Sequence, residues 1–203
     1  MSPTLDTDVP QRLLDAAEHL FYERGVQAVG VDAVVARAGV ATKTLYAHFG
    51  SKDGLVEAYL RRRDQRWLNW LRDAVDTVEP GPARVFAVFD ALGQWFAQPN
   101  YNGCAFINIA GELAASPTAR SIARDHKVAL RALLLDVAAG AGVTDHTTLA
   151  DRLMLLVEGA IITAHVEHDG AAAERARSAA AALLELDQLT SKPPLHSGPY
   201  PTN

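Results

Sequence analysis

Apolar residues recur at intervals of three and four along almost the whole chain, which is the spacing that places them on one face of an α-helix. Strict alternation of apolar and polar residues, which is typical of a half-buried strand, is hard to find. The pattern predicts an all-α protein of about nine helices, separated by turns that contain Gly, Pro and Asn. The expected helices cover residues 8–24, 31–38, 42–48, 52–78, 105–114, 117–140, 147–168 and 172–189. One more helix follows the break at residues 80–82, contains Val85 to Phe96 and ends before Pro99.

Local signals mark helix ends and divide the chain into three parts. Asp8 is expected to cap the first helix, Gly25 to end it, and Ser51 to cap the fourth. We expect the first three helices, within residues 1–50, to form a small domain and residues 51–189 to form a larger helical domain. The tail, residues 190–203, holds four of the ten prolines and few large apolar residues, so we expect it to be disordered.

The composition fits a globular chain without disulfides. Its 203 residues are 49% hydrophobic and 21% charged, which is enough apolar content to bury a core. Cys104 is the one cysteine, which excludes an intramolecular disulfide and favours a reducing compartment. The first residues have neither a basic start nor an apolar stretch, and no uncharged apolar run reaches about 18 residues. We therefore expect a soluble cytoplasmic protein with no signal peptide, no membrane partner, and no metal or other cofactor.

Charge is distributed unevenly. The chain has 19 Lys and Arg against 24 Asp and Glu, a net charge of −5, which argues against a generally basic nucleic-acid coat protein. Residues 1–72 carry ten basic and nine acidic residues, whereas residues 73–203 carry nine basic and fifteen acidic residues. Any contact with phosphates is therefore expected near the N-terminal end.

Residues 31–49 have the pattern of a helix-turn-helix. Small and branched apolar residues give the first helix an inner face, Gly39 permits a sharp turn, and Leu45 and Phe49 anchor the second helix. The outward side of the second helix carries Thr42, Lys43, Thr44, Tyr46, Ala47 and His48. Such hydroxylated, aromatic and basic side chains can meet base edges and phosphates in a major groove. The spacing alone does not exclude a helix pair with a purely structural role, because such pairs also occur in proteins that never touch DNA.

The sequence around this motif is similar to that of a known family. RLLDAAEHLFYERG at 12–25, Val34, AGV at 38–40 and TLYAHFGSK at 44–52 together resemble the DNA-binding region of the TetR family of bacterial transcriptional regulators. This resemblance implies a DNA-binding regulator without enzymatic activity. It further implies a repressor that binds a palindromic operator as a homodimer and is released by a small-molecule effector.

Carried over by position, the resemblance assigns roles to side chains on the second helix of the motif. It implies that Thr42, Lys43 and Tyr46 reach bases or their flanking backbone, and that Thr44, His48 and Lys52 chiefly hold phosphates. Lys52 also lies at a helix start, where backbone N–H groups favour an anion.

The chain departs from the family pattern at four positions. Gly30 stands where a Ser or Thr often caps the second helix, Val35 replaces a small Ala, and Ala41 replaces a frequent Ser. Lys43 occupies a position often held by Gly or Pro, so no operator sequence can be transferred from the family.

The densest basic cluster lies farther along the chain, at Arg61, Arg62, Arg63 and Arg66. Charge runs on long helices usually face water, so we favour a solvated helix face over direct phosphate contact for this cluster.

Beyond its N-terminal region the family resemblance implies only an architecture, a helical domain that dimerises through its last two helices and holds an effector pocket. The penultimate helix is apolar on nearly every side, as expected when one face meets its own core and another meets a partner. The expected dimer contacts are Leu155, Gly159, Ile162, Val166, Leu183, Leu184 and Leu186. A fully buried central helix in a monomer is the alternative.

A second set of residues predicts an aromatic-lined cavity suited to a small, mostly apolar effector. The candidates are Trp95, Phe96, Tyr101, Cys104, Asn108, Glu112, Met154, Glu158, Ile161 and His165. Their polar members need partners if they are buried, and those partners are either protein side chains or a ligand. Cys104 is also a candidate thiol sensor, although a small core residue is the simpler interpretation.

Two other classes of function stay open on the residues alone. Glu158 and His165 are spaced for acid–base catalysis, but a binding pocket explains their spacing equally well, and the common hydrolase, phosphate-loop and zinc-helix motifs are missing from the sequence. A helical ligand-binding protein that keeps the helix-turn-helix as scaffold is the second alternative. Salt-dependent binding to duplex DNA distinguishes a regulator from both.

Overall fold

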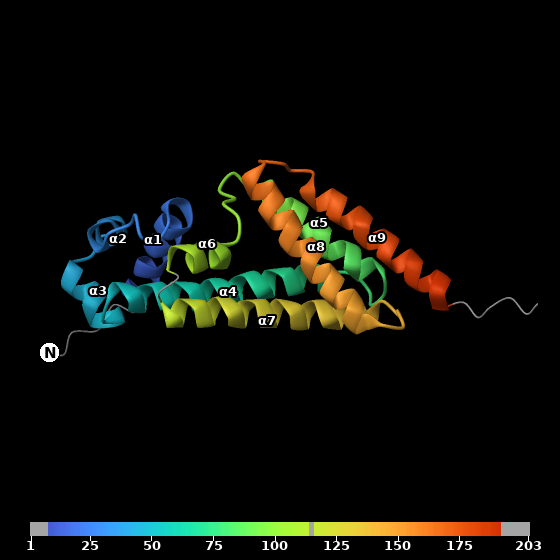
Figure 1. Ribbon diagram of the computed structural model, residues 1–203. Helices are drawn as coiled ribbons and strands as arrows, with labels where there is room; N and C mark the ends of the chain where they lie inside the picture. The colour runs from blue at the N-terminus through green and yellow to red at the C-terminus, as the bar shows by residue number, and fades with distance from the viewer. Residues whose placement is uncertain (1–7, 114–115, 192–203) are drawn as a thin grey trace, which may run out of the picture.

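The computed structural model describes residues 8–113 and 116–191, which form helices joined by short loops and contain no strand (Figure 1). The helices are α1 (Val9–Arg24), α2 (Val31–Ala38), α3 (Thr42–Phe49), α4 (Lys52–Asp76), α5 (Ala83–Phe96), α6 (Ala105–Glu112), α7 (Pro117–Gly140), α8 (His146–Val166) and α9 (Ala172–Ser191). The all-α prediction is confirmed, and each predicted helix end lies within two residues of the observed one.

Two local expectations need correction. Asp8 precedes α1 but makes no side-chain capping bond, because its carboxylate lies toward Arg12 with an N–O distance of 3.7 Å. The predicted disordered tail began too early, since Thr190 and Ser191 belong to α9. The remainder of that tail lies outside the described residues. Ser51 does cap α4, accepting the backbone N–H of Gly54 at 3.0 Å.

Helices α1, α2 and α3 form a small unit around a shared apolar centre. Leu13, Val34 and Leu45 are each almost completely buried there. Gly39 takes the left-handed conformation, with φ of +66°, that lets the chain turn sharply from α2 into α3. This turn sets the angle between the two helices and leaves the outer face of α3 open.

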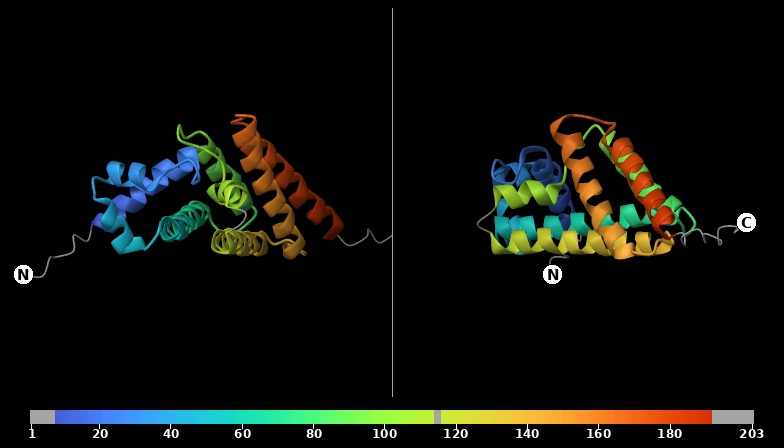
Figure 2. Two further views of the ribbon diagram at one scale, coloured as in Figure 1. Left: turned by 60° about the vertical axis from the view of Figure 1, so that its left-hand side comes forward. Right: turned by 45° about the vertical axis from the view of Figure 1, so that its right-hand side comes forward.

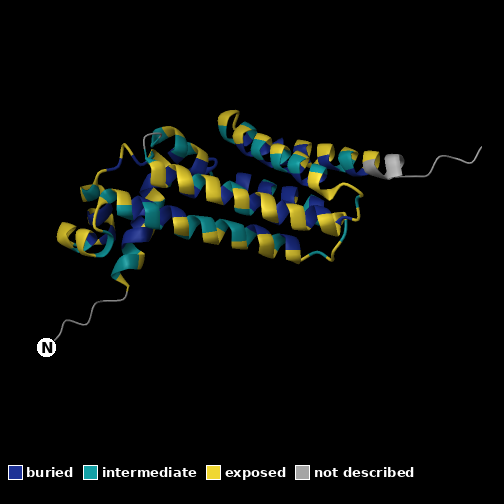
Figure 3. Ribbon diagram, turned by 60° about the horizontal axis from the view of Figure 1, so that its bottom comes forward, coloured by how far each residue is buried: buried dark blue, intermediate teal, exposed yellow. Residues whose placement is uncertain are grey.

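The other helices form a larger body that is joined to this unit through α4. Helices α4 and α7 lie side by side, α8 packs against α7 and α9, and α5 packs against α4 and α9 (Figure 1). Helices α1 and α3 also pack against α4, so the two parts share one continuous hydrophobic core. Along the long helices one face is buried and the opposite face is exposed, as the 3.6-residue periodicity requires (Figure 3).

Candidate nucleic-acid interface and effector region

Helix α3 is anchored by few side chains and leaves the others in solvent. Leu45 is fully buried, and Phe49 packs against the core from the last turn. Thr42, Lys43 and Tyr46 are exposed, and Tyr46 has 47% of its surface open to water although it is aromatic. Helix α3 lies at the end of the molecule farthest from α9 (Figures 1 and 2). An exposed helix with hydroxyl, ammonium and phenol groups has the shape and chemistry for a major groove.

The three residues predicted to hold phosphates are less exposed. Thr44 and His48 are half-buried, and the His48 ring lies 6.4 Å from that of Phe49. Lys52 donates from Nζ to the carbonyl oxygen of Val26 at 2.7 Å. An ammonium group has three donors, so this bond still leaves Lys52 able to bind an anion. The phosphate role of all three residues stays a prediction.

The arginines on α4 are tied to acidic side chains of α1. Arg62 donates to Asp15 at 2.8 Å and to Glu18 at 2.6 Å. Glu18 also accepts from Arg66 at 2.9 Å and from Arg63 at 3.4 Å. One carboxylate therefore serves three guanidinium groups and joins the small unit to the body.

The expectation of a solvated basic face is correct only for the outer two arginines. Arg61 is exposed and pairs with Glu57 one turn earlier on its own helix, at 2.8 Å, and Arg66 is also exposed. Arg63 is only 12% exposed, and its guanidinium carbon lies 3.8 Å from the centre of the Tyr22 ring. Sequence patterning did not predict this junction, because the acidic partners come from a different helix.

The loop between α5 and α6 connects the end of α1 to α8. Tyr22 on α1 donates its hydroxyl to the Gly103 carbonyl at 2.9 Å and accepts the backbone N–H of Asn102 at 2.9 Å. In the same loop, the Tyr101 hydroxyl donates to the carbonyl of Ile161 on α8 at 2.7 Å. Burial raises the pKa of Tyr101, so its hydroxyl stays protonated and can donate this bond.

Asn108 and Glu112, predicted as effector ligands, lie at this junction instead. Asn108 donates from Nδ2 to the carbonyl of Asn102 at 3.0 Å, which fixes the loop. Glu112 accepts the backbone N–H of Gln27 at 3.0 Å, beside Gly25 at the end of α1. These polar atoms thus help to hold the loop and the small unit of α1 to α3, and the effector role of both residues stays a prediction.

The aromatic candidates do come together, and α4 adds two more. Trp95 lies 5.0 Å from Tyr101 and 5.9 Å from Phe96, measured between ring centres. Trp67 and Trp70 of α4 lie 5.6 Å and 6.2 Å from Trp95. We missed both α4 residues, although their separation by three positions places them on one helix face.

The enclosed space beside these rings is small. Trp95, Cys104 and Ile161 border a cavity of about 10 Å³, which is the volume needed by a single water molecule and far below that of a drug-sized ligand. Met154 is half-buried and borders neither this cavity nor the larger cleft described below. This cavity as it stands is too small for the predicted effector, so the effector role of the residues that border it stays a prediction.

Of the remaining polar candidates, Glu158 has a protein partner. It binds Lys127 of α7, with Nζ–O distances of 2.7 and 2.9 Å, and the same Nζ lies 3.5 Å from the Cys104 sulfur. The ring of His165 lies 6.4 Å from that of Tyr101, and its side chain packs against Gly103. The simpler interpretation, in which protein side chains satisfy these groups, thus holds for Glu158.

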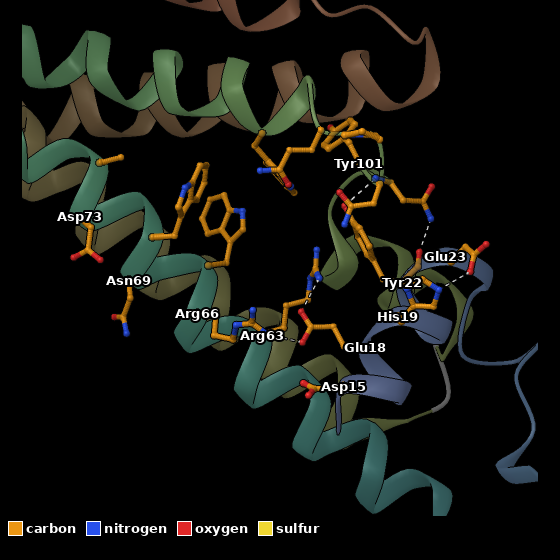
Figure 4. A pocket seen from close by; sticks show the side chains of 18 of the residues that line it. Asp15, Glu18, His19, Tyr22, Glu23, Arg63, Arg66, Asn69, Asp73 and Tyr101 are labelled. Atoms are coloured by element: carbon orange, nitrogen blue, oxygen red, sulfur yellow. Dashed lines mark hydrogen bonds and ion pairs between the residues drawn. The ribbon is translucent and has the colours of Figure 1, made fainter. Parts of the chain in front are cut away.

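A much larger hollow opens on the other side of Trp67 and Trp95. It is a cleft of about 1280 Å³ between α1, α4 and the loop after α5 (Figure 4). Trp95 and Tyr101 are the two predicted effector residues that border it. The cleft was not predictable from one helix at a time, because it lies where the small unit and the body meet.

His126 on α7 is a buried polar residue that sequence reasoning did not single out. Its Nδ1 lies 2.7 Å from Asp64, and its ring stacks on Phe106 at 3.8 Å between centres. Burial lowers the pKa of His126 to about 4, outweighing the opposing effect of the Asp64 carboxylate.

The predicted dimer stripe on α8 is open to solvent. Leu155 is 74% exposed, and Gly159, Ile162 and Val166 are also exposed. Large apolar residues aligned on one exposed helix face are typical of an interaction surface. Their participation in a dimer stays a prediction.

The predicted contacts on α9 divide into two kinds. Leu186 is exposed and lies on the same side of α9 as the small residues Ala179 and Ala182, which are also exposed. Leu184 is only 5% exposed and Leu183 packs against the core. We therefore correct the expectation for Leu184, whose side chain is already used within its own subunit.

Over residues 8–113 and 116–191, no three His, Cys, Asp or Glu side chains are grouped as a metal site would require. None of the helices in these ranges is long and apolar enough to cross a membrane.

Comparisons with known proteins agree with this geometry. A family model described as "Bacterial regulatory proteins, tetR family" matches residues 13–59, which include α2, α3 and most of α1. The HTH-type transcriptional activator FasR of Mycolicibacterium smegmatis is 38% identical over 81 residues, 40% of this chain and 37% of FasR. The HTH-type transcriptional repressor KstR2 of Mycobacterium tuberculosis is 31% identical over 109 residues, 52% of each chain. The chain thus spans at most about half the length of these curated relatives.

Similarity to a solved structure extends over almost the whole fold. The crystal structure of a putative TetR transcriptional regulator from Streptomyces avermitilis matches with a TM-score of 0.76 and 30% identity. The match covers 89% of this chain and 98% of that protein. The N-terminal helix-turn-helix unit and the C-terminal helical body are therefore shared together, and with them a regulatory rather than an enzymatic role. This chain belongs to the TetR family of bacterial transcriptional regulators.

Proposed function

We propose that this chain is a homodimeric repressor that binds a palindromic operator and is released by a small-molecule effector. The observation that carries the proposal is the exposure of Thr42, Lys43 and Tyr46 on α3, while Leu45 on the opposite side of the helix is fully buried. A helix anchored in this way can enter the major groove without disturbing its own core. Tyr46 and Lys43 then meet base edges or flanking phosphates, and Thr42 adds a hydroxyl.

Local charge supports DNA binding near α3. The excess of acidic residues is confined to residues 73–203, and α3 itself carries Lys43 and His48 but no Asp or Glu. Lys52 and Thr44 extend this surface toward the backbone of the duplex. Because phosphate contacts release counterions, operator affinity falls steeply as salt concentration rises.

The exposed stripe on α8 supports homodimer formation. Leu155, Ile162 and Val166 offer apolar surface, and Gly159 between them allows a second helix to approach closely. Leu186 extends the surface onto α9. A two-fold dimer presents two α3 helices to half-sites about one turn of duplex apart, which is why we propose a palindromic operator.

An effector controls binding by favouring dimers in which the two α3 helices are wrongly spaced for the operator. Repression agrees with the name of KstR2, whereas FasR is named an activator. Because its target is the bacterial chromosome, we place its action in the cytoplasm.

Selection of bound sites from random duplex DNA tests this function. We expect the purified full chain to enrich a palindrome with two half-sites, and the affinity for that palindrome to fall steeply between 50 and 200 mM salt, by about tenfold or more. A protein that keeps the helix-turn-helix only as scaffold would enrich no sequence and bind no duplex at either salt concentration.

A further inference from the structure

The cleft between the DNA-binding unit and the helical body has the size of a small-molecule site. Its volume of about 1280 Å³ exceeds the roughly 300–1000 Å³ of most ligand pockets, so a small molecule fits within it. Helix α1 forms one wall, α4 forms the floor, and the loop after α5, which carries Tyr101, forms the other wall (Figure 4). A molecule in this cleft would touch both parts of the protein at once.

The floor of the cleft is aromatic. All three tryptophans of the chain border it, with Trp67 and Trp70 half-buried and their ring centres 5.9 Å apart. Tyr101 continues this surface beyond Trp95. Such rings favour a flat aromatic partner that stacks on them or meets them edge to face.

At the arginine end of the cleft, more positive than negative side chains take part in the ion pairs that join α4 to α1. Within residues 8–113 and 116–191, the ion pairs of Arg62, Arg63 and Arg66 join three guanidinium groups to two carboxylates, those of Asp15 and Glu18. Arg66 is 63% exposed and binds Glu18 through one nitrogen, although a guanidinium has five N–H donors. A carboxylate entering from solvent can therefore pair with Arg66, an interaction stronger than one between neutral groups.

The other acidic residues of the cleft do not cancel this charge. Glu23 lies 3.5 Å from both His19 and Arg24, so it already has basic neighbours. Asp73 follows Arg66 by seven residues, which is about 10 Å along the helix. Figure 4 shows Asp73 at the opposite end of this stretch of α4. An anion bound at the arginine end thus leaves Asp73 in solvent.

We propose that this cleft binds a flat aromatic carboxylate, whose ring lies against Trp67 and Trp70 and whose carboxylate pairs with Arg66. The claim that this ligand is the effector rests on the proposed function, whereas the claim that it binds in the cleft does not. Its carboxylate binds the remaining donors of Arg66, and its negative charge beside Glu18 weakens the ion pair between Glu18 and Arg66. Because Glu18 is the α1 residue that joins three arginines of α4, this weakening loosens α1 from α4 and changes the position of α3.

Calorimetric titration of the full chain, without DNA, tests the site. The probes are benzoate, 1-naphthoate and pyrene-1-carboxylate, with 1-naphthalenemethanol as the neutral counterpart. We expect at least one carboxylate to bind, and to bind more tightly than the alcohol does. Arg66→Gln should weaken carboxylate binding about tenfold or more, because an ionic hydrogen bond is lost. Glu18→Gln should strengthen it several-fold, because Arg66 is freed.

Two control variants locate the ligand. Arg72→Gln removes the same charge from the same helix, but Arg72 pairs with Asp136 outside the cleft. This variant should therefore bind the carboxylate as tightly as the unmodified chain does. Lys127→Gln changes a residue that borders the small cavity behind Trp67, and this variant should also bind the carboxylate as tightly as the unmodified chain does.

The proposal is overturned if no carboxylate binds, if Arg66→Gln and Arg72→Gln behave alike, or if Lys127→Gln is the variant that loses binding. None of these outcomes affects operator selection. Conversely, if the chain binds a carboxylate but selects no operator, the proposed function is refuted and the proposed binding site is still supported.

Discussion

The DNA-binding unit and the helical body use their polar side chains differently. On α3, Lys43 and Tyr46 extend into solvent from a helix whose buried side is apolar. On α4, Arg62 and Arg63 look equally basic in the sequence, yet each is bound to Glu18 of α1. The comparison teaches that basic residues in a sequence do not by themselves predict a nucleic-acid surface, because the fold can pair them with carboxylates of another helix.

The same contrast appears in the relationship with other proteins. The family model covers residues 13–59, whereas the match to the solved regulator covers 89% of the chain at 30% identity. Reading a groove requires a fixed angle between two short helices, which depends on residues such as Gly39. The body can preserve its helix packing with many different apolar residues, which leaves its cleft free to vary.

The largest expected effect comes from the proposed dimer surface of the body. Leu155→Asp places a charge in the exposed stripe of α8, so we expect sedimentation to detect monomers and operator affinity to fall by about 100-fold or more. Val128→Asp is the matched control, because Val128 is also exposed but lies on α7. Dissociation by the control variant, with Leu155→Asp still dimeric, would place the interface on α7.

A smaller loss is expected when the junction between the two regions is broken. Glu18→Gln leaves Arg62 and Arg63, both mostly buried, without their shared carboxylate, and should lower the free energy of unfolding by roughly 2–3 kcal/mol in urea. Glu57→Gln removes an exposed partner of Arg61 on the same helix and should cost less than about 1 kcal/mol. Equal losses in the two variants would contradict a special role for Glu18.

The smallest expected effect is a pH dependence within the body. The pKa of His126 is about 4 in the folded chain and near 6.5 when unfolded, so the unfolded chain binds the extra proton between these values. This contribution to stability is complete above about pH 6.5 and is lost as pH falls toward 4. Between pH 7 and pH 5 we expect the free energy of unfolding of the unmodified chain to fall by about 1–2 kcal/mol more than that of the His126→Gln variant, as measured by urea unfolding. Parallel pH profiles would contradict this assignment.

The helices were predictable because their signals are local. Apolar spacing, Gly39 and Ser51 act within one turn, and the outward side of α3 follows directly from the burial of Leu45 and Phe49. Helix ends therefore needed no knowledge of the tertiary structure.

The polar partners in the body were not predictable in this way. Glu112 meets Gln27 across 85 positions, and Glu158 meets Lys127 across 31. Leu184 looked like a dimer contact on its helix, but the rotation of α9 against its neighbours buries it. Residues that depend on such distant packing cannot be assigned from periodicity alone.

The most direct test of the central claim compares operator binding by the unmodified chain with that of the Lys43→Ala, Tyr46→Ala double variant. We predict a loss of about 100-fold in specific affinity, since each contact to a base contributes about 1–3 kcal/mol, with the melting temperature and dimer unchanged. Unchanged affinity for the selected operator would contradict the account, because the exposed face of α3 would then have no part in reading DNA.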